Sequence, residues 1–295
     1  MTLIIILLIF LMASFICFCV AFYVPAGRRM KYTDYFDHNM FNPYHDYYWP
    51  LVEKLAAEEY EAVETQSFDG IRLAGRLYIY NPGGPFVIFM HGYKANCIGD
   101  YAGCVGFYRD LGYNILLTDE RAEGNSGGKT ITFGACERYD CLSWIEYISE
   151  RFGSPETVLH GLSMGAATVL CTLSEDLPSN VVKVVSDCAF SSAAAMMSRY
   201  ATPFGYLAVA FGALVFGNFR LNSVSPVKSV KKARIPVLFI HGEADELIPI
   251  KMCRKLYDAC ASEKYLFTVP GAGHAVSSLK DPEGCKKALT QFLKG

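Results

Sequence analysis

The chain alternates short apolar runs with longer stretches in which apolar residues recur at helical spacing. Runs that suit β-strands lie at residues 61–67, 71–80, 86–90, 113–118, 157–159, 181–186, 237–240 and 264–269. Helical stretches lie at residues 99–111, 136–152, 164–174, 251–261 and 275–293. Uninterrupted apolar runs such as 86–90 are typical of strands buried on both faces of a mostly parallel sheet. The pattern predicts an α/β fold with a mostly parallel central sheet of about eight strands flanked by helices, its first two strands forming an antiparallel edge hairpin.

One connection in this alternation is too long for an ordinary crossover. Residues 191–236 separate two successive predicted strands, and residues 203–219 within them carry no charge. A second membrane span is one interpretation, but this stretch is short for one. We therefore expect a helical cap insertion over a functional site, with apolar residues that line a pocket for an acyl or aryl group or touch a bilayer surface.

The amino-terminal stretch is apolar enough to cross a membrane. Residues 3–24 contain no charged residue, and a stretch of this length is long enough for a transmembrane helix. A cleaved signal peptide is the alternative, but the basic region that begins such peptides is absent. We predict an uncleaved anchor over residues 1–27, and Arg28, Arg29 and Lys31 directly after it place the rest of the chain on the cytoplasmic side.

The rest of the chain divides into two unequal parts. Residues 28–59 are rich in aromatic and charged residues and end in a helical stretch. Their aromatic side chains suit either a lipid interface or packing against the following domain, and we assign them no chemistry. Residues 60–295 form the predicted α/β domain, which includes the cap insertion at 191–236.

Composition removes several classes of function. The net charge of −2 gives no basic field of the kind that nucleic acid requires, so no nucleic-acid partner is expected. The eleven cysteines include no C-x-x-C pair, which suits a reducing compartment better than a disulfide framework. Because metal-ligand spacing is also missing, we predict neither a metal nor an organic cofactor. The oligomeric state stays open.

The most informative motif is the pentapeptide Gly161-Leu162-Ser163-Met164-Gly165 between a predicted strand and a predicted helix. A serine flanked by glycines at such a turn is the nucleophile-elbow arrangement, in which the hydroxyl stands clear of the sheet. The glycines let the strand and the helix approach each other closely. The positive end of the helix then faces the place where negative charge develops during acyl transfer. This pattern makes Ser163 the candidate nucleophile.

A serine nucleophile needs a general base and a group that orients the base. Asp245 and His274 follow two later predicted strands, in the chain order Ser, Asp, His that this architecture uses. We predict that His274 accepts the Ser163 proton and that Asp245 fixes the histidine tautomer. Asp187, at the end of an intervening strand, is the rival for the acid.

Three other histidines, His91, His160 and His241, each precede a glycine at a strand end, and we interpret them as structural. Backbone N–H groups at two positions are predicted to form the oxyanion hole. One belongs to Met164, directly after the nucleophile, and the other to Tyr93, in the loop after the third strand.

From about residue 60 to its end, the chain resembles the alpha/beta-hydrolase superfamily, in particular its serine-aminopeptidase-like, acylglycerol-lipase-like and cinnamoyl-esterase-like branch. The matching motifs lie at residues 91–93, 161–165, 241–245 and 273–274. With these motifs, the resemblance implies a serine hydrolase that cleaves carboxylic esters through an acyl-serine intermediate, as carboxylesterases and lipases do. A peptidase or amidase would use the same residues, and a catalytically idle binding protein is the alternative from another class.

One segment departs from the pattern of related sequences, which often read D-x-R-G-x-G-x-S after the fourth strand. Here Ala122 replaces the first glycine, and Glu123 replaces the usual aromatic residue or histidine. We expect the turn to be kept through Gly124. A charge at the pocket rim would favour cationic or amine-bearing substrates, whereas a solvated turn glutamate is the simpler interpretation.

Overall fold

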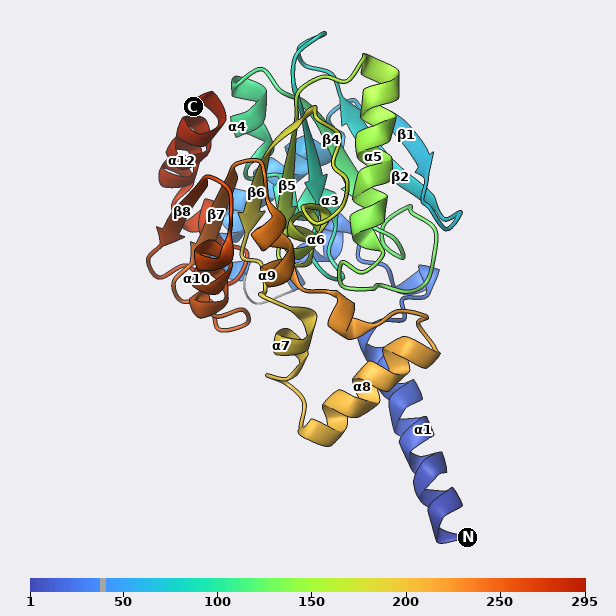
Figure 1. Cartoon of the computed structure of the whole chain (residues 1–295). Helices are drawn as coiled ribbons and strands as arrows, with labels where there is room; N and C mark the ends of the chain where they lie inside the picture. The colour runs from blue at the N-terminus through green and yellow to red at the C-terminus, as the bar shows by residue number, and fades with distance from the viewer. Residues whose placement is uncertain (38–40) are drawn as a thin grey trace.

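The computed structural model describes residues 1–37 and 41–295 and confirms the predicted α/β fold (Figure 1). Its eight strands are β1 (Glu61–Gln66), β2 (Arg72–Tyr78), β3 (Phe86–Met90), β4 (Asn114–Asp119), β5 (Thr157–Leu162), β6 (Val181–Asp187), β7 (Val237–Gly242) and β8 (Lys264–Val269). They form one sheet in the order β1-β2-β4-β3-β5-β6-β7-β8. Strand β2 runs antiparallel to β1 and β4, and the other pairs are parallel, as the hairpin and the apolar runs predicted.

Helices cover both faces of the sheet. The α-helices of the described residues are α1 (Thr2–Ala21), α2 (His45–Ala57), α3 (Cys97–Tyr101), α4 (Val105–Asp110), α5 (Glu137–Phe152), α6 (Met164–Thr172), α7 (Ala193–Met197), α8 (Pro203–Val215), α9 (Pro226–Ser229), α10 (Ile250–Ala259), α11 (Ser277–Lys280) and α12 (Pro282–Lys294). Helices α2, α3, α4 and α12 share one hydrophobic core with the sheet, and α5, α6 and α10 share a second. Strand residues alternate between the two cores, since Val87 and Phe89 face the first whereas Phe86 and Ile88 face the second.

Two predicted helices are each divided in two. The stretch predicted at 99–111 forms α3 and α4, separated by residues 102–104. The stretch predicted at 275–293 forms α11 and α12, because Asp281 caps a new helix that begins with Pro282. Apolar spacing continues across both breaks, so it did not reveal them.

The aromatic-rich segment packs against the sheet domain. Tyr48, Val52 and Leu55 on one face of α2 are buried in the first core, and the Tyr48 hydroxyl donates to the Gly99 carbonyl. Of this segment, residues 38–40 lie outside the described residues. For the helical part, the packing interpretation is confirmed rather than the lipid interface.

The amino-terminal helix is apolar and largely exposed, and it leads directly into the domain. Phe22, just after α1, is fully buried between the rings of Phe133 and Phe219. The Val24 N–H donates to the Lys129 carbonyl at 2.8 Å. Figure 1 shows α1 projecting from the domain, with α8 crossing it.

Candidate active site

Ser163 stands at the turn between β5 and α6. Its φ of 55° and ψ of −109° are unusual for a residue with a side chain, as a nucleophile elbow requires. The Ser163 N–H donates to the Asp187 carbonyl at 2.8 Å, which ties the turn to the end of β6. The side chain therefore leaves the sheet at the carboxyl end of its central strands.

The structure brings the three predicted side chains together from three loops. His274 Nε2 lies 2.9 Å from Ser163 Oγ, and His274 Nδ1 lies 2.8 Å from Asp245 Oδ2. The second carboxylate oxygen of Asp245 accepts the Ile248 N–H at 2.7 Å, so the loop after β7 fixes the carboxylate. A histidine held in this way can take a proton from the serine while the carboxylate stabilises the imidazolium. The catalytic role of the three residues stays a prediction.

The two predicted oxyanion donors lie at the same pocket as Ser163. No residue in the described ranges accepts a hydrogen bond from the backbone N–H of Tyr93 or Met164. The Asp100 carboxylate accepts the neighbouring Gly92 N–H at 2.6 Å and thereby orients the loop after β3. The Tyr93 hydroxyl donates to the Ala21 carbonyl at 2.8 Å, which joins this loop to the end of α1.

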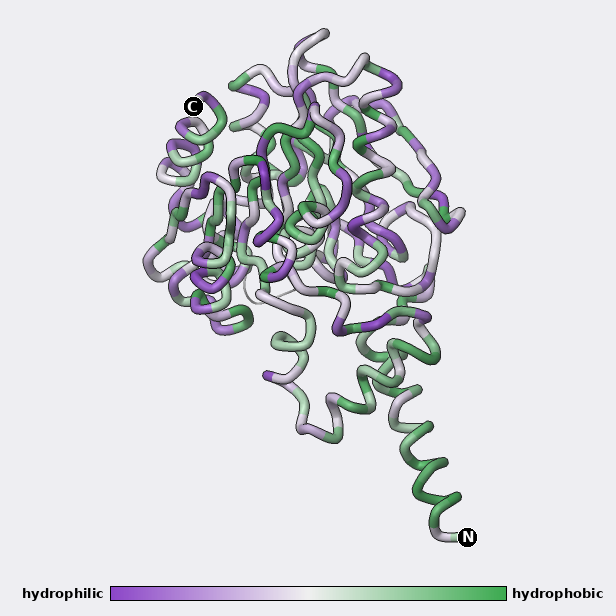
Figure 2. Tube along the Cα trace, viewed as in Figure 1, coloured by the Kyte–Doolittle hydropathy of each residue, from purple (hydrophilic) through white to green (hydrophobic). Residues whose placement is uncertain are grey.

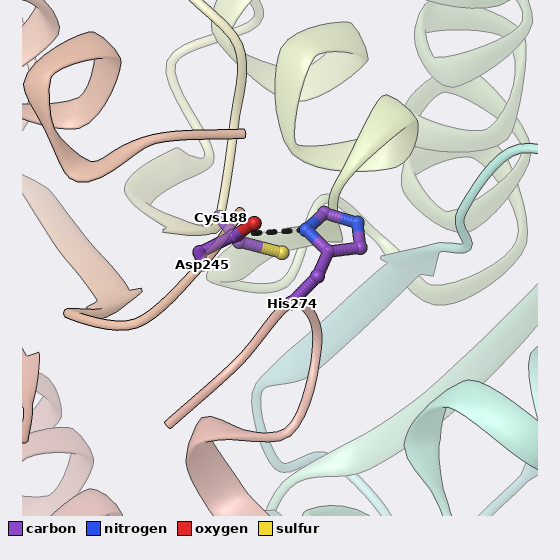
Figure 3. A group of neighbouring side chains, drawn as sticks. All are labelled: Cys188, Asp245 and His274. Carbon is purple, nitrogen blue, oxygen red and sulfur yellow. Dashed lines mark hydrogen bonds and ion pairs between the residues drawn. The ribbon is translucent and has the colours of Figure 1, made fainter. Parts of the chain in front are cut away.

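A cysteine to which the sequence assigned no role at the site completes the immediate surroundings of the histidine. Figure 3 shows the Cys188 thiol beside the Asp245–His274 pair, close enough for the three side chains to offer ligand atoms to one ion. Burial, with Asp187 and Asp245 nearby, raises the pKa of the Cys188 thiol well above its usual range. His274 Nδ1 is already bonded to Asp245 Oδ2, and Asp245 Oδ1 accepts the Ile248 N–H. The cluster therefore suits a hydrogen-bonded acid and base better than a metal site.

The other strand-end histidines make local contacts, as expected of structural residues. His91 Nε2 accepts the Glu120 N–H, and His241 Nε2 lies 2.7 Å from the Ile248 carbonyl. His160 Nδ1 lies 2.9 Å from the Tyr108 hydroxyl, and burial lowers the pKa of His160 to about 3. His160 is therefore neutral at pH 7.

Asp187 is buried behind the site, and its carboxyl is hydrogen-bonded neither to His274 nor to any other residue in the described ranges. Burial, followed by the nearby Asp245 and Asp100, raises the pKa of Asp187 to about 8. At neutral pH this side chain is largely protonated, so it does not replace Asp245 as the partner of the imidazolium.

Replacing Asp187 with asparagine is expected to increase stability in alkaline solution and to change activity by less than about threefold. The folded protein holds a proton that the unfolded chain releases near pH 4, so this contribution to stability is lost as pH rises through about 8. The asparagine amide does not titrate in this range, so its contribution to stability does not change with pH. The melting temperature of Asp187→Asn relative to the parent should therefore increase from pH 5 to pH 8 and level off above it. A loss of activity as large as that of Asp245→Asn would make Asp187 the acid instead.

Glu123 does not lie on a solvated turn, so that interpretation is wrong. The residue is 2% exposed at the edge of the pocket, and its Oε2 lies 3.3 Å from His91 Nδ1. Burial raises the pKa of the Glu123 carboxyl well above its usual range. The turn itself is kept, since Ala122 adopts φ 64° at the position where related sequences have glycine, and Gly124 adopts φ 46°.

A cavity of about 1050 Å³ opens at Ser163 and is lined mainly by apolar side chains. Met196, Met197 and Tyr200 of the insertion line it, but no residue of α8 does. Of the insertion, α7 and the residues after it therefore line the cavity, as expected of a cap, whereas α8 does not. The apolar side chains of α8 lie instead against α1 and toward solvent.

The amino-terminal segment contributes to this cavity, which the sequence did not indicate. Val20, Ala21 and Val24 line it together with Arg28 and Arg29. The Arg29 guanidinium donates to the carbonyls of Gly124, Ser126 and Gly128. No local pattern relates Arg29 to a loop about a hundred residues away, so only the folded chain shows this contact.

Comparisons with known proteins agree with this architecture. Residues 107–295 match the model of the prolyl oligopeptidase family, Peptidase_S9. The chain is 29% identical to the uncharacterized protein YqkD of Bacillus subtilis over 70% of each chain. It is 26% identical to lysophosphatidylserine lipase ABHD12 of Danio rerio, over 62% of this chain and 49% of the lipase.

Solved structures show the same fold. The Pyrococcus furiosus esterase Pf2001 superposes with a TM-score of 0.66 at 24% identity, over 82% of this chain and 94% of the esterase. The alpha/beta hydrolase GrgF from a Penicillium species superposes with a TM-score of 0.65 at 17% identity, over 80% of this chain and 98% of GrgF.

Proposed function

The chain belongs to the prolyl oligopeptidase family within the alpha/beta-hydrolase superfamily, and on that premise we propose that it is a membrane-anchored serine esterase. One observation chiefly supports this proposal: Ser163 Oγ, His274 and Asp245 form a continuous hydrogen-bonded chain at the mouth of an apolar cavity. Similar proteins support the same proposal, since they include an esterase and a lysophosphatidylserine lipase.

In the proposed reaction, His274 Nε2 accepts the Ser163 proton as Oγ attacks the ester carbonyl carbon. The carbonyl oxygen becomes negatively charged and is stabilised by the N–H groups of Tyr93 and Met164 and by the positive end of α6. When the tetrahedral intermediate collapses, the C–O bond breaks and His274 returns its proton to the leaving alcohol. Water activated by His274 then attacks the acyl-serine, and this releases the acid and restores the serine.

Asp245 acts through His274. Its buried carboxylate accepts a hydrogen bond from the Nδ1–H group, which leaves Nε2 unprotonated and free to receive the proton from the serine. It also stabilises the positive charge that the imidazole gains in each transition state. No step requires a metal or an organic cofactor.

The proposed anchor is α1. Its 20 residues correspond to about 30 Å of helix, the thickness of a bilayer hydrocarbon core. Several contacts favour retention of α1 over removal as a signal peptide. Phe18 packs in a core shared with the cap insertion, and the carbonyls of Val20 and Ala21 accept hydrogen bonds from the Lys94 ammonium and the Tyr93 hydroxyl. The basic residues Arg28, Arg29 and Lys31 favour the cytoplasmic side for the domain.

Hydrolysis of p-nitrophenyl esters from two to sixteen carbons tests the proposed function. The full chain in detergent is required, because Phe22 and Val24 belong to the domain core. We expect turnover to increase from acetyl to chains of eight or more carbons, because each buried methylene contributes about 0.8 kcal/mol. A Ser163→Ala control should be inactive toward every ester.

The same preparation separates the alternatives when it is treated with a fluorophosphonate probe. Labelling of Ser163 without turnover of any ester would favour a peptidase or amidase, which the family description makes the second candidate. Absence of both labelling and turnover would favour a binding protein.

A further inference from the structure

We propose that α8 inserts, together with α1, into the membrane leaflet nearest the hydrolase domain, and that the substrate is a membrane-resident lipid ester that enters the cavity from this leaflet. The second half of this inference rests on the proposed esterase function. Figure 2 shows α1 and α8 as mostly hydrophobic segments beneath a domain in which hydrophobic and hydrophilic residues alternate.

The outer face of α8 is unusually apolar for a surface in water. Phe204 is 57% exposed, Leu207 59%, Leu214 48% and Val215 51%. No charged residue occurs between Arg199 and Arg220. A contiguous apolar surface of this kind marks an interaction site on a soluble protein or a contact with lipid.

The partner that the structure itself indicates is lipid, because this face continues the surface of α1. Phe10 packs edge-on against Phe204 and Phe211, with ring centroids 5.7 Å and 5.2 Å apart, and Phe15 packs against Phe216 at 5.1 Å. At the crossing, Gly212 lies so close to the Ser14 carbonyl that a side chain would not fit. Small residues at a close helix crossing are typical of helix pairs in membranes. A bilayer that surrounds α1 would therefore also meet α8.

The contacts between α1 and α8 also define how deep α8 lies in the bilayer. They involve residues 10–18 of α1, which lie 3 to 11 residues before Ala21 and thus about 5–17 Å below the end of the helix nearest the domain. Half of a hydrocarbon core is about 15 Å thick. Helix α8, with 13 residues and a length of about 20 Å, is too short to span the bilayer and lies across this half of it.

The basic residues next to α1 and α8 lie where the lipid headgroups are expected. Arg199 and Arg220 are exposed on either side of the apolar segment, and Arg28 and Lys31 are exposed just after α1. Basic side chains at these positions can contact lipid phosphates while the helices between them meet hydrocarbon.

The cavity at Ser163 adjoins the pair of helices α1 and α8. The chain that leaves α1 contributes Val20, Ala21 and Val24 to its lining, and the chain that leads into α8 contributes Met197 and Tyr200. One wall of the substrate cavity is therefore built from residues at the end of α1 and from the residues that join α1 and α8 to the domain. An acyl chain can pass from the bilayer to Ser163 along apolar side chains, so a lipid avoids the cost of transfer through water.

Fluorescence quenching tests the insertion without reference to activity. The full chain with Leu207→Trp is reconstituted in vesicles of brominated phosphatidylcholine. Ile79→Trp is the matched control, because Ile79 is exposed and follows β2, which ends at the edge of the sheet opposite the carboxyl ends of the parallel strands. We expect quenching of the added tryptophan in Leu207→Trp and none in Ile79→Trp. Equal quenching of both, or of neither, would overturn the insertion of α8.

A second measurement tests the entry of substrate from the leaflet. In the full chain, L207E/L214E is expected to lower turnover of p-nitrophenyl palmitate in phosphatidylcholine vesicles at least tenfold while turnover of water-soluble p-nitrophenyl acetate changes less than twofold. The control I79E/L266E places the same charges on exposed apolar residues away from α8 and should affect neither ester. Equal effects on both esters, or no effect, would contradict the inference. If the parent hydrolyses neither ester, the proposed function fails, and quenching still decides the insertion.

Discussion

Replacing His274 with alanine is expected to lower kcat for ester hydrolysis by roughly 10⁴- to 10⁶-fold, because Ser163 then has no group to accept its proton. The fold should survive. The His274 side chain lies at the cavity, and its ring nitrogens are hydrogen-bonded to Ser163 and Asp245. The measurement is the rate with the best p-nitrophenyl ester, combined with thermal unfolding to show that the variant is folded.

Companion variants separate a catalytic role from a structural one. Ser163→Ala should lose as much activity as His274→Ala, and the double variant should be no worse, since the two residues act as one unit. Asp245→Asn should lose somewhat less, about 10⁴-fold. His45→Ala is the matched control, because His45 lies on α2, outside the cavity lining, and should keep full activity. A folded His274→Ala variant with near-normal turnover would refute the assignment.

The sequence predicted the sheet well because a strand buried on both faces is a short run of apolar residues, which can be recognised without knowledge of the rest of the chain. The run 86–90 is apolar at every position, and β3 occupies those same residues. The order of the candidate residues was equally informative, since parallel strands bring the loops after β5, β7 and β8 to one edge. Ser163, Asp245 and His274 could therefore be placed near one another without any knowledge of side-chain geometry.

Contacts between distant segments could not be predicted in the same way. Helix α8 is apolar around most of its circumference, so periodicity does not indicate which face packs or against what. Its partner α1 lies about two hundred residues earlier, and the close approach of Gly212 to Ser14 exists only in the folded chain. The same limit applies to Glu123, which is charged and sits in a turn but is buried against His91.

The glycine two residues after the nucleophile should be indispensable for folding, and Gly165→Ala is expected to prevent accumulation of folded protein. A β-carbon at Gly165 would overlap the Met90 carbonyl at the end of β3, and one at Gly161 would overlap the Gly165 carbonyl. These neighbours are backbone atoms, one at the end of β3 and one in the first turn of α6, so neither can move aside cheaply. Overpacking commonly costs about 1–3 kcal/mol and occasionally more. Because the atom that a β-carbon at Gly165 would overlap is backbone of β3, the cost here should approach the total stability of about 5–15 kcal/mol.

Gly106→Ala in α4 provides the matched control, because its β-carbon would meet only the Arg109 guanidinium, at 4.0 Å. Alanine is a better helix former than glycine by about 1 kcal/mol, so this variant should melt at or above the temperature of the parent. Thermal unfolding of both variants in detergent makes the comparison. Gly165→Ala melting within a few degrees of the parent would mean that α6 and β3 are less tightly apposed than this packing requires. Since neither substitution touches a reacting group, the comparison tests the nucleophile elbow through its packing alone.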